Sequence, residues 1–457
     1  MSNIAHIHYP QSGRLVILGA GESGVGAAIL GKDKGFDVFV SDMGAIAAQY
    51  KDTLVKERIP FEEGTHSQHL ILNAQLIVKS PGIPEKAPLI KQLRELGIPV
   101  ISEIEFAAQY TDAKLYCITG SNGKSTTTML TYYMLQKAGV DVGLAGNIGK
   151  SFALQVARDP HAVYALEISS FMLDDMYHFR ADVAVILNIT PDHLDRYDYQ
   201  LEKYVASKFR MIQNQTEQDY FIYCADDEET IKALERFPTK AQYLPMSQVK
   251  EETIGAWVTQ NKNIEIKVPH RELFTMNIEE LSLQGKHNVY NNMASGLVAK
   301  VQELRNQSMK ESMSSYVNIE HRLEHVACIG GVNYINDSKA TNVNSVWYAL
   351  ESFSPDIVLI MGGVDKGNDY EMLRDLVKSK VKAIICIGKD TTRIHESFEN
   401  DTDVIVNSAS MQDAVSIASH LVKKGDTVLL SPACASFDWF KNYEERGNQF
   451  KEAVMAL

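Results

Sequence analysis

Short apolar runs alternate with longer segments of helical periodicity along the whole chain. They form three groups, at 15–18, 37–42 and 76–78, then at 114–119, 163–166, 183–187 and 221–224, and finally at 357–360, 383–386, 404–406 and 427–430. Strand-sized runs that alternate with helical patterns are typical of parallel sheets. The pattern predicts an α/β protein of three domains, each built on a mainly parallel sheet. The length of 457 residues suits that number at roughly 150 residues per domain.

Two polar stretches and one change of pattern refine this organisation. The stretches 109–112 and 306–318 are predicted to be linkers between the domains. Between 243 and 283 the apolar runs become short and alternating, which predicts a small antiparallel patch attached to the second sheet.

Composition narrows the choice of partners and compartment. The chain has 45 Lys and Arg against 58 Asp and Glu, a net charge of −13, which disfavours a general nucleic-acid binder because such proteins need a basic surface. No apolar run approaches the roughly 18 residues that cross a bilayer, and residues 1–10 lack a signal-peptide pattern. The five cysteines form no CxxC pair. We therefore expect reduced thiols, a cytoplasmic protein, and no membrane partner.

A first glycine-rich loop follows the first apolar run. Gly19-Ala20-Gly21-Glu22-Ser23-Gly24 matches GxGxxG, and Asp42 ends the next predicted strand. By itself this context argues for a dinucleotide such as NAD. The backbone N–H groups at a helix start bind the pyrophosphate of other nucleotides equally well. A tight strand-to-helix turn without a ligand is the alternative.

A second loop opens the second domain. Gly120-Ser121-Asn122-Gly123-Lys124-Ser125-Thr126 also lies between a predicted strand and a predicted helix. Lys124 is expected to meet the β- and γ-phosphates of ATP, and the Ser125 hydroxyl to bind Mg²⁺. Ile118 stands where the usual GxxxxGK[ST] spacing has glycine, so this is a shorter loop. A hydride-transfer enzyme needs only the first of these two loops.

Three further residues are placed for chemistry by the same sheet. Glu167 ends a predicted strand and His193 follows another, and ligands gather at the carboxyl ends of parallel strands. Glu167 is therefore a candidate Mg²⁺ ligand, with a solvated strand end as the alternative. A lone histidine is more often structural. Lys208 lies on the following helix, where a solvated lysine is the ordinary outcome.

In this order the motifs resemble those of the Mur ligases, the ATP-dependent amino-acid-adding enzymes of peptidoglycan synthesis. The segments that carry the resemblance are Ile118–Thr126, Gly146–Gly149, Glu167–Phe171, Asp192–Tyr197, His287-Asn288, His321-Arg322, Asn336–Asn342 and Leu430–Asp438. The segments Asn336–Asn342 and Leu430–Asp438 resemble the family members that add D-glutamate to UDP-N-acetylmuramoyl-L-alanine. The resemblance extends over all three predicted domains.

The resemblance implies a division of labour. Residues 1–111 form a Rossmann-like domain for the UDP substrate, which displaces NAD from the first loop. Residues 112–317 form a P-loop-type domain for ATP and two Mg²⁺ ions, and residues 318–457 a Rossmann-like domain for the amino acid. The implied reaction passes through an acyl phosphate and releases ADP and phosphate.

The resemblance also assigns roles to individual residues. Lys124, Glu167, His193 and Lys208 are the implied catalytic group. The implied metal ligands are Ser125, Glu167, His193 and Lys208 as a CO₂-derived carbamate. ATP is expected at residues 120–126 and at Asn288, Asn291, Arg322, Asp337 and Lys339. The UDP substrate is expected at residues 19–24 and at Asp42, Ser80, Gly82, Asn147 and Ser169, and D-glutamate at Thr341, Lys366, Ser436 and Phe437.

Two departures and several alternatives remain open at this point. Met172 stands where some relatives carry glutamine, and a thioether cannot replace the hydrogen bonds of an amide. Asp365 directly precedes Lys366, a local variant that leaves the role of Asp365 open. The alternatives are a Mur ligase that adds another amino acid, an NAD-dependent oxidoreductase, and a noncatalytic nucleotide-binding regulator. We expect a monomer.

Overall fold

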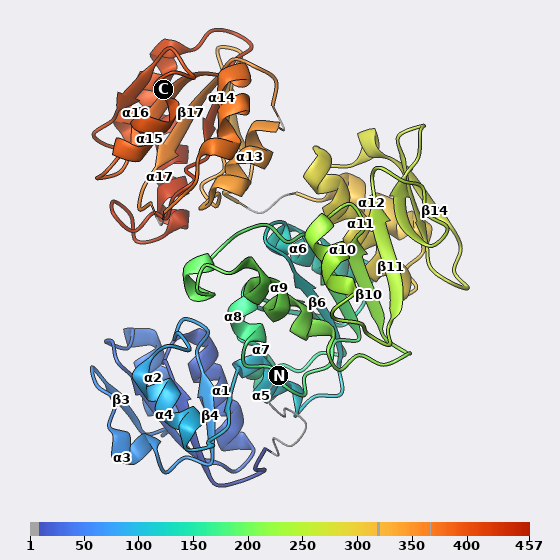
Figure 1. Ribbon diagram of the computed structural model, residues 1–457, viewed down its shortest axis with the longest axis vertical. Coiled ribbons are helices and arrows are strands. Elements are labelled where there is room, and N and C mark those ends of the chain that lie inside the picture. The colour runs from blue at the N-terminus through green and yellow to red at the C-terminus, as the bar shows by residue number, and fades with distance from the viewer. Residues whose placement is uncertain (1–8, 318–319, 352, 366) are drawn as a thin grey trace. The chain divides into compact units, whose positions relative to one another are not determined.

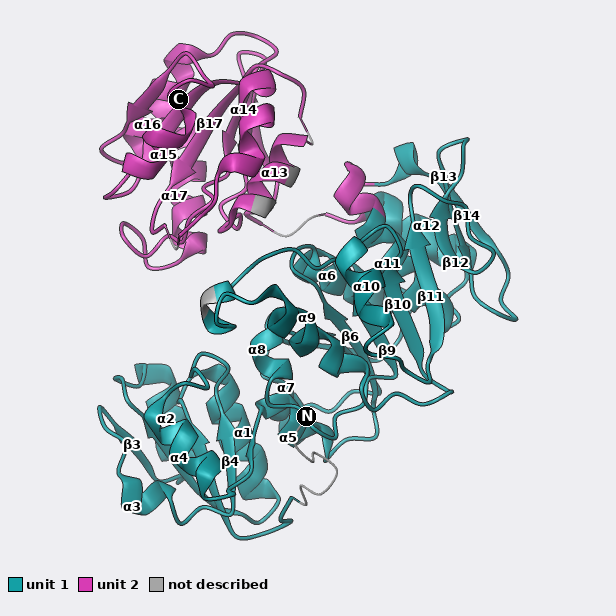
Figure 2. Cartoon of the chain, viewed as in Figure 1, with its two compact units in different colours: residues 1–281, 290–315 teal, residues 282–289, 316–457 magenta. Residues whose placement is uncertain are grey.

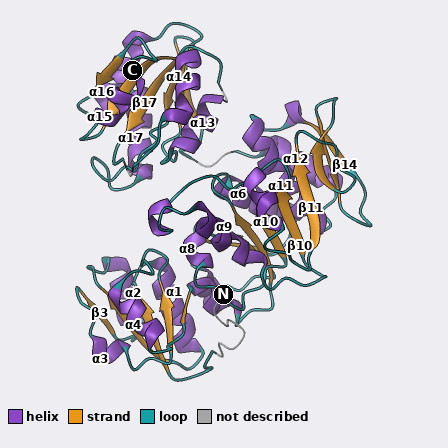
Figure 3. Cartoon of the chain, viewed as in Figure 1, coloured by secondary structure: helices purple, strands orange, loops and turns teal. Residues whose placement is uncertain are grey.

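The computed structural model contains three sheets, flanked by helices (Figures 1 and 3). It describes residues 9–317, 320–351, 353–365 and 367–457. Within these ranges, none of the helices is long and apolar enough to cross a membrane. The predicted α/β class with mainly parallel sheets is confirmed.

The N-terminal sheet is entirely parallel, with the strand order β3-β2-β1-β4-β5. The order reverses at β1, whose neighbours are β2 and β4, and such a switch point leaves a crevice at the strand ends where ligands bind. The elements are β1 (Arg14–Leu18), α1 (Glu22–Asp33), β2 (Asp37–Asp42), α2 (Ala48–Lys56), β3 (Phe61–Glu63), α3 (Gln68–Ile71), β4 (Leu76–Lys79), α4 (Pro88–Glu95), β5 (Val100–Ile101) and α5 (Glu103–Ala108).

The central sheet has the order β14-β13-β12-β11-β10-β9-β6-β8-β7. It is parallel from β7 to β12, and β12, β13 and β14 pair antiparallel, which confirms the predicted patch. The elements are β6 (Lys114–Thr119), α6 (Lys124–Lys137), β7 (Val142–Gly146), α7 (Phe152–Arg158), β8 (Val163–Glu167), α8 (Ser170–Leu173), β9 (Val183–Ile186), η2 (Leu194–Arg196), α9 (Leu201–Phe209), η3 (Arg210–Ile212), β10 (Tyr220–Cys224), α10 (Glu228–Leu234), β11 (Gln242–Ser247), β12 (Gly255–Val258), β13 (Asn263–Lys267), β14 (Phe274–Asn277), η4 (Ile278–Glu280), α11 (Lys286–Val301) and α12 (Asn306–Ser315).

The C-terminal sheet has the order β15-β16-β20-β17-β18-β19; among the strands described, β15 and β16 pair antiparallel and the other neighbours pair parallel. Its central strands β17 and β20 are buried along their whole length. The elements are β15 (Glu324–Ile329), β16 (Val332–Asn336), α13 (Val343–Glu351), β17 (Ile357–Gly362), η5 (Glu371–Leu373), α14 (Arg374–Lys380), β18 (Val381–Ile387), α15 (Thr392–Phe398), β19 (Ile405–Asn407), α16 (Met411–Leu421), β20 (Thr427–Leu430) and α17 (Tyr443–Met455).

The chain divides into two compact units (Figure 2). The first contains the N-terminal and central sheets, and the second contains the C-terminal sheet with residues 282–289. The prediction of a linker over 306–318 is wrong for most of that segment, because residues 306–315 form α12. Met309 and Met313 of this helix are fully buried, and the hydroxyls of Tyr133 and Ser315 lie 3.2 Å apart. The predicted boundaries at 111 and 317 stay a prediction.

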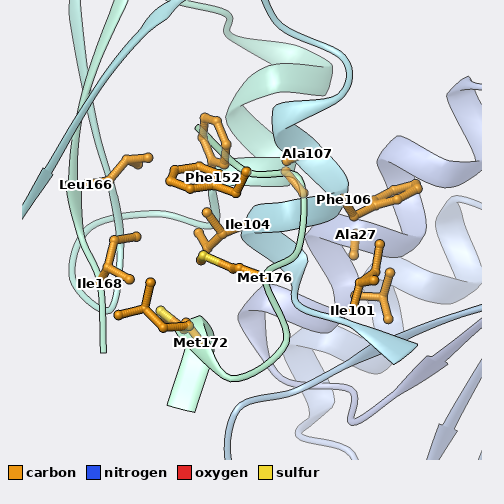
Figure 4. Packing of buried hydrophobic residues seen from close by; sticks show 14 of the residues in the cluster. Ala27, Ile101, Ile104, Phe106, Ala107, Phe152, Leu166, Ile168, Met172 and Met176 are labelled. Carbon is orange, nitrogen blue, oxygen red and sulfur yellow. The ribbon is translucent and has the colours of Figure 1, made fainter. Parts of the chain in front are cut away.

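A shared apolar core joins the N-terminal and central sheets. Figure 4 shows side chains of α1, α5, α7, β8 and α8 in one cluster, with Ile104 and Phe152 at its middle. Met172 belongs to this cluster, close to Ile168 (Figure 4), and is 4% exposed. The thioether therefore packs as a core side chain, where an amide would have to be desolvated.

Two buried carboxylates of α5 reinforce the same boundary. Glu103 accepts hydrogen bonds of 2.7 Å from the Ser151 hydroxyl and from the backbone N–H of Ala153, at the start of α7. Glu105 accepts one of 2.8 Å from the backbone N–H of His178. Burial raises the pKa of Glu103 to about 7. The contacts make the two sheets one unit through polar as well as apolar groups.

We expect the substitution Glu103→Gln to flatten the pH dependence of stability. The pKa is about 7 in the folded protein and usually 4.5, so between these values the folded state binds the proton more tightly than the unfolded chain. The free energy of unfolding therefore falls as pH rises through this window. The shifted pKa of Glu103 contributes at most about 3 kcal/mol to the free energy of unfolding at low pH, and this contribution is lost as the pH rises above about 7. Urea unfolding at pH about 5 and about 7.5 measures it.

The matched control is Glu95→Gln, which changes an exposed carboxylate at the end of α4. It should follow the wild-type protein at both pH values. A Glu103→Gln variant whose unfolding free energy falls as steeply as that of the wild type would contradict the prediction.

Candidate functional site

The second glycine loop connects β6 to α6 in a conformation that requires glycine. Gly120 has φ 153° and Gly123 φ 83°, both in the region that side chains disfavour. A Cβ on Gly123 would lie 2.5 Å from Oδ1 of Asn291. The loop is held by the segment that follows β9, because the backbone N–H of Ser121 donates to the Asn188 carbonyl at 2.9 Å. The predicted strand–loop–helix context is confirmed, and α6 begins at Lys124.

Two lysines converge on one carbonyl of this loop. The Nζ atoms of Lys208 and Lys124 donate to the Gly120 carbonyl oxygen at 2.8 and 2.9 Å. Lys208 is 1% exposed and its Nζ lies 4.5 Å from the centroid of the Tyr204 ring. Burial first, and the positive charge of Lys124 second, place the pKa of Lys208 well below its usual value. Lys208 is therefore no solvated helix lysine, and its neutral amine is favoured.

Glu167 ends the strand next to β6, and only one of its two carboxylate oxygens has a hydrogen-bond partner among the described residues. β8 pairs with β6 so that Glu167 lies opposite Ile118. Glu167 is 1% exposed. Its Oε1 accepts from the Asn147 side-chain amide at 2.8 Å, while its Oε2 has no hydrogen-bond partner among the residues that the structure describes. A buried carboxylate oxygen without a partner is costly alone and suits a hard cation such as Mg²⁺.

His193 has a left-handed backbone and partners of its own. Its φ is 52°, its Nε2 lies 3.6 Å from Asp192, and its ring centroid lies 5.1 Å from that of Phe171. Among the described residues, no group of three or more His, Cys, Asp or Glu side chains is arranged to hold a metal ion. A metal site here would need the Ser125 hydroxyl and a modified Lys208, so the role of His193 stays a prediction.

The first glycine loop borders a pocket of about 770 Å³ in the N-terminal sheet. Five of the predicted UDP-site residues line this pocket, namely Gly19, Gly21, Asp42, Ser80 and Gly82. A Cβ on Gly19 would lie 2.4 Å from the Ser80 hydroxyl, whereas one on Gly21 would meet nothing within 4 Å. The loop therefore packs closely against Ser80 of the turn after β4 at Gly19, whereas at Gly21 there is open space.

The other predicted UDP-site residues have structural partners. The N–H of Ala20 donates to Asp42 at 2.7 Å, and Glu22 accepts from the N–H of Ser151 at 3.2 Å. Ser169 caps α8. A Cβ on Gly24 would lie 1.9 Å from the Gly19 carbonyl, so glycine is required for packing there. None of the predicted residues Ala20, Glu22, Ser23, Gly24, Asn147 and Ser169 is among those that line the pocket. The Asn147 side chain contacts Glu167.

Predicted ATP-site residues fall in both units. In the first unit, Asn291 accepts from the Thr127 hydroxyl of α6 at 3.1 Å. In the second unit, the Asn288 amide donates to the Gln284 carbonyl at 2.8 Å. Asp337 accepts from the Ser431 hydroxyl at 2.9 Å, and burial raises its pKa to about 7 although Arg322 opposes the shift. The Lys339 Nζ lies 5.4 Å from the centroid of the Tyr443 ring.

Three of the predicted D-glutamate residues, Thr341, Ser436 and Phe437, lie on loops of the second unit. Ser436 is 2% exposed and Phe437 70% exposed, Thr341 is exposed, and Lys366 lies outside the described residues. Sequence reasoning missed Arg446, a fully buried residue of α17 whose guanidinium donates to the Ser338 hydroxyl and to the Cys434 carbonyl at 3.0 Å each. It ties together the two segments that resemble D-glutamate ligases, and no local motif marks it.

The hydrogen bonds of Asp365 indicate a structural role for this residue. Its Oδ1 accepts from the N–H groups of Gly367 at 2.7 Å and Asn368 at 2.8 Å, and from Arg393 at 3.1 Å. Its Oδ2 accepts from the Tyr370 hydroxyl at 3.1 Å. Asp365 therefore organises the loop that follows β17, next to a pocket of about 260 Å³.

Fold and site together define a multidomain, nucleotide-binding α/β protein with a phosphate loop in its middle sheet. Three family models match this chain. Residues 118–299 match the Mur ligase middle domain, residues 321–434 the Mur ligase glutamate ligase domain, and residues 13–102 the MurD-like N-terminal domain of Mur ligases. The chain belongs to the Mur ligase family, as its motifs predict.

Curated relatives match over nearly the whole chain. It is 53% identical to the UDP-N-acetylmuramoylalanine–D-glutamate ligase of Bacteroides thetaiotaomicron and 52% identical to that of Bacteroides fragilis. Both alignments span 445 residues, 97% of this chain and 100% of the relative. The matches favour an amide ligase over an NAD-dependent oxidoreductase.

Solved structures share the fold at low sequence identity. A pseudomurein peptide ligase type C from Methanothermus fervidus aligns with a TM-score of 0.62 at 19% identity, covering 97% of this chain and 99% of that one. A UDP-N-acetylmuramate–alanine ligase from Thermotoga maritima aligns with a TM-score of 0.60 at 18% identity and the same coverage. These likenesses support the three-sheet architecture.

We expect the substitution Asp365→Asn to raise the KM for the amino-acid substrate about tenfold and to leave the KM for ATP unchanged. The amide keeps an acceptor for Gly367 and Asn368 but loses the charge-assisted bond with Arg393, worth about 1.5–3 kcal/mol. Steady-state kinetics with each substrate varied in turn measure the effect. Asp369→Asn is the control, because this exposed neighbour accepts only from the N–H of Glu371 in the hydrogen bonds described. Equal KM values in the two variants would refute the role of Asp365.

Proposed function

We propose that this protein joins D-glutamate to UDP-N-acetylmuramoyl-L-alanine at the expense of ATP, a step of peptidoglycan precursor synthesis. The observation that carries the proposal is the end-to-end match, at 52–53% identity, to ligases of this name. The phosphate loop beside a buried acid and a buried lysine supplies the parts that such a ligase needs. We place the activity in the cytoplasm, where ATP is available, and propose a monomer.

The chemistry explains why an ATP site is needed. A carboxylate is a poor electrophile towards an amine, and transfer of the γ-phosphoryl group of ATP to the L-alanyl carboxylate gives an acyl phosphate. The neutral amine of D-glutamate attacks this carbonyl, the amine nitrogen gives one proton to a base or to solvent, and the tetrahedral intermediate collapses with loss of phosphate. Two anions must first come together, so cationic groups must offset their charge. Lys124 at the start of α6 supplies one such charge.

Metal ions supply the remaining charge neutralisation in this proposal. The Oε2 atom of Glu167 and the hydroxyl of Ser125 suit one Mg²⁺. A second Mg²⁺ is assigned to Glu167, His193 and a carbamate on Lys208. A neutral Lys208 amine can add CO₂ with loss of a proton, which gives an anionic oxygen ligand. The lowered pKa and complete burial of Lys208 support this modification.

The remaining residues hold substrates in the proposed scheme. The 770 Å³ pocket takes the UDP part, with the open position of Gly21 towards the pyrophosphate. Asn288, Asn291, Arg322, Asp337 and Lys339 are assigned to ATP. Thr341, Lys366, Ser436 and Phe437 are assigned to D-glutamate.

We expect phosphate release from ATP, Mg²⁺ and UDP-N-acetylmuramoyl-L-alanine to require D-glutamate among individually tested amino acids. Calorimetry should show that UDP binds and that NADH does not, because the first loop serves the UDP substrate. A preference for L-alanine, L-lysine or diaminopimelate would replace the assigned amino acid. Tight NADH binding without UDP binding would overturn the function itself.

We expect Lys208→Ala to lose at least about 100-fold in kcat with the fold intact, the upper range for disturbing a metal's ligand environment. Added acetate should restore part of the activity, because it can occupy the vacated ligand position. The control is Lys203→Ala on the same helix, which removes a half-exposed lysine paired with Asp198. Near wild-type activity of Lys208→Ala in CO₂-depleted buffer would rule out the carbamate.

A further inference from the structure

The turn that follows β4 presents its backbone to the UDP pocket. Ser80, Gly82 and Ile83 line this pocket, and Pro81 lies between them. Three consecutive carbonyls of the turn are each bound by a cationic side chain. Arg196 donates to the carbonyls of Pro81 and Gly82 at 3.1 Å each, and the Nζ of Lys79 donates to that of Ile83 at 2.8 Å.

Arg196 comes from the central sheet and not from the sheet that builds the pocket. It ends η2, three residues after His193, whose left-handed backbone starts this short helix. The two carbonyls are contacted by two different nitrogens of one planar guanidinium. Such a fork fixes the relative orientation of both partners, which a lysine ammonium cannot do.

Arg196 also contacts Phe171, which in turn contacts His193 of the predicted catalytic group. Its guanidinium carbon lies 4.4 Å from the centroid of the Phe171 ring, and this ring lies 5.1 Å from that of His193. Phe171 belongs to α8, which begins three residues after Glu167. The sequence of contacts therefore runs from the pocket turn through Arg196 and Phe171 to His193.

A buried ion pair that does not involve Arg196 also anchors this boundary. Lys79 and Asp175 are 2% and 1% exposed at the side chain, and Nζ lies 2.9 Å from Oδ2. Because this pair holds the end of β4 against the segment after α8, removal of Arg196 leaves the two sheets attached. Loss of the Arg196 side chain should therefore free only the turn that follows β4.

We propose that Arg196 is a positioning residue that couples occupancy of the UDP pocket to the placement of Phe171 and His193 at the phosphate end of the site. A ligand that orders the turn orders Arg196 and, through it, the segment next to the phosphate loop. By linkage, nucleotide bound at that loop must then strengthen binding in the UDP pocket by the same factor. The inference rests on the proposed function for the identity of the two ligands.

The coupling can be measured without turnover. Calorimetry gives the Kd of ADP with Mg²⁺ in the absence and presence of saturating UDP-N-acetylmuramoyl-L-alanine. We expect the UDP substrate to tighten ADP binding about fivefold or more in the wild-type protein. In Arg196→Met and Arg196→Lys the two values should agree within about twofold, and the KM for the UDP substrate should rise while the KM for D-glutamate stays unchanged.

The control is Arg158→Met. Arg158 of α7 also bridges the two sheets, but its partners are Asp33 and, at 3.3 Å, Glu57, which are not part of the pocket turn. It should keep the wild-type coupling. Thermal unfolding of all variants tests that the fold is retained.

Two results would overturn the inference. One is a wild-type protein in which the UDP substrate leaves the Kd of ADP unchanged. The other is an Arg196→Lys variant with wild-type coupling, which would show that charge and not the fork is needed. A wild-type protein that couples the two ligands but does not consume D-glutamate would instead refute the proposed amino-acid substrate and leave the role of Arg196 intact.

Discussion

The carbonyl oxygen of Gly120 accepts hydrogen bonds from the side chains of two lysines, Lys124 and Lys208, and much of the site follows from that arrangement. Gly120 has a φ of 153°, a conformation that side chains disfavour, and its carbonyl oxygen lies within hydrogen-bond distance of the Nζ atoms of Lys124 and Lys208. Burial disfavours the charged form of Lys208, and the nearby positive charge of Lys124 adds to this effect, so the pKa of Lys208 lies well below its usual value. Lys208 is therefore shifted towards its neutral amine, whereas Lys124 stands at the start of α6, where a phosphate group would bind. The same loop thus separates two lysines into two chemical roles.

Glu167 completes this division because its two oxygens have different surroundings. Asn147 binds one of them, and the other faces no donor among the described residues. Asn147 belongs to the glycine-rich turn after β7, which pairs with β8. The sheet register thus brings the orienting amide to the carboxylate. An oriented carboxylate next to a phosphate loop is what a magnesium–nucleotide site requires.

The N-terminal and central sheets form one compact unit because both apolar side chains and paired polar side chains are buried between them. The apolar cluster of Figure 4 supplies area, while Glu103, Lys79 and Asp175 supply specific partners. Buried charges without partners are costly, so these pairs favour one relative arrangement of the two sheets. Arg196 uses that fixed arrangement to reach from one ligand site to the other.

Some expectations succeeded or failed for reasons that particular residues make clear. Both glycine loops were predictable because a strand, a glycine turn and a helix start are adjacent in the chain. The linker prediction over 306–318 relied on serine content and overlooked Met309 and Met313, whose spacing of four residues places both on one buried helix face. Residues 19–24 were assigned to the UDP site as a block. The structure shows that Gly19 and Gly21 line the pocket, whereas Gly24 is packed against the Gly19 carbonyl and does not line it.

The sequence by itself determined the α/β class, the family, the phosphate loop and the presence of Glu167 at a strand end, because each depends on residues close together in the chain. Only the tertiary structure decided the surroundings of those residues. Lys208 reaches the Gly120 carbonyl across 88 positions, and Arg196 reaches the turn after β4 across 114 and 115. Burial and charge–charge distance depend on such remote contacts, and no local pattern encodes them.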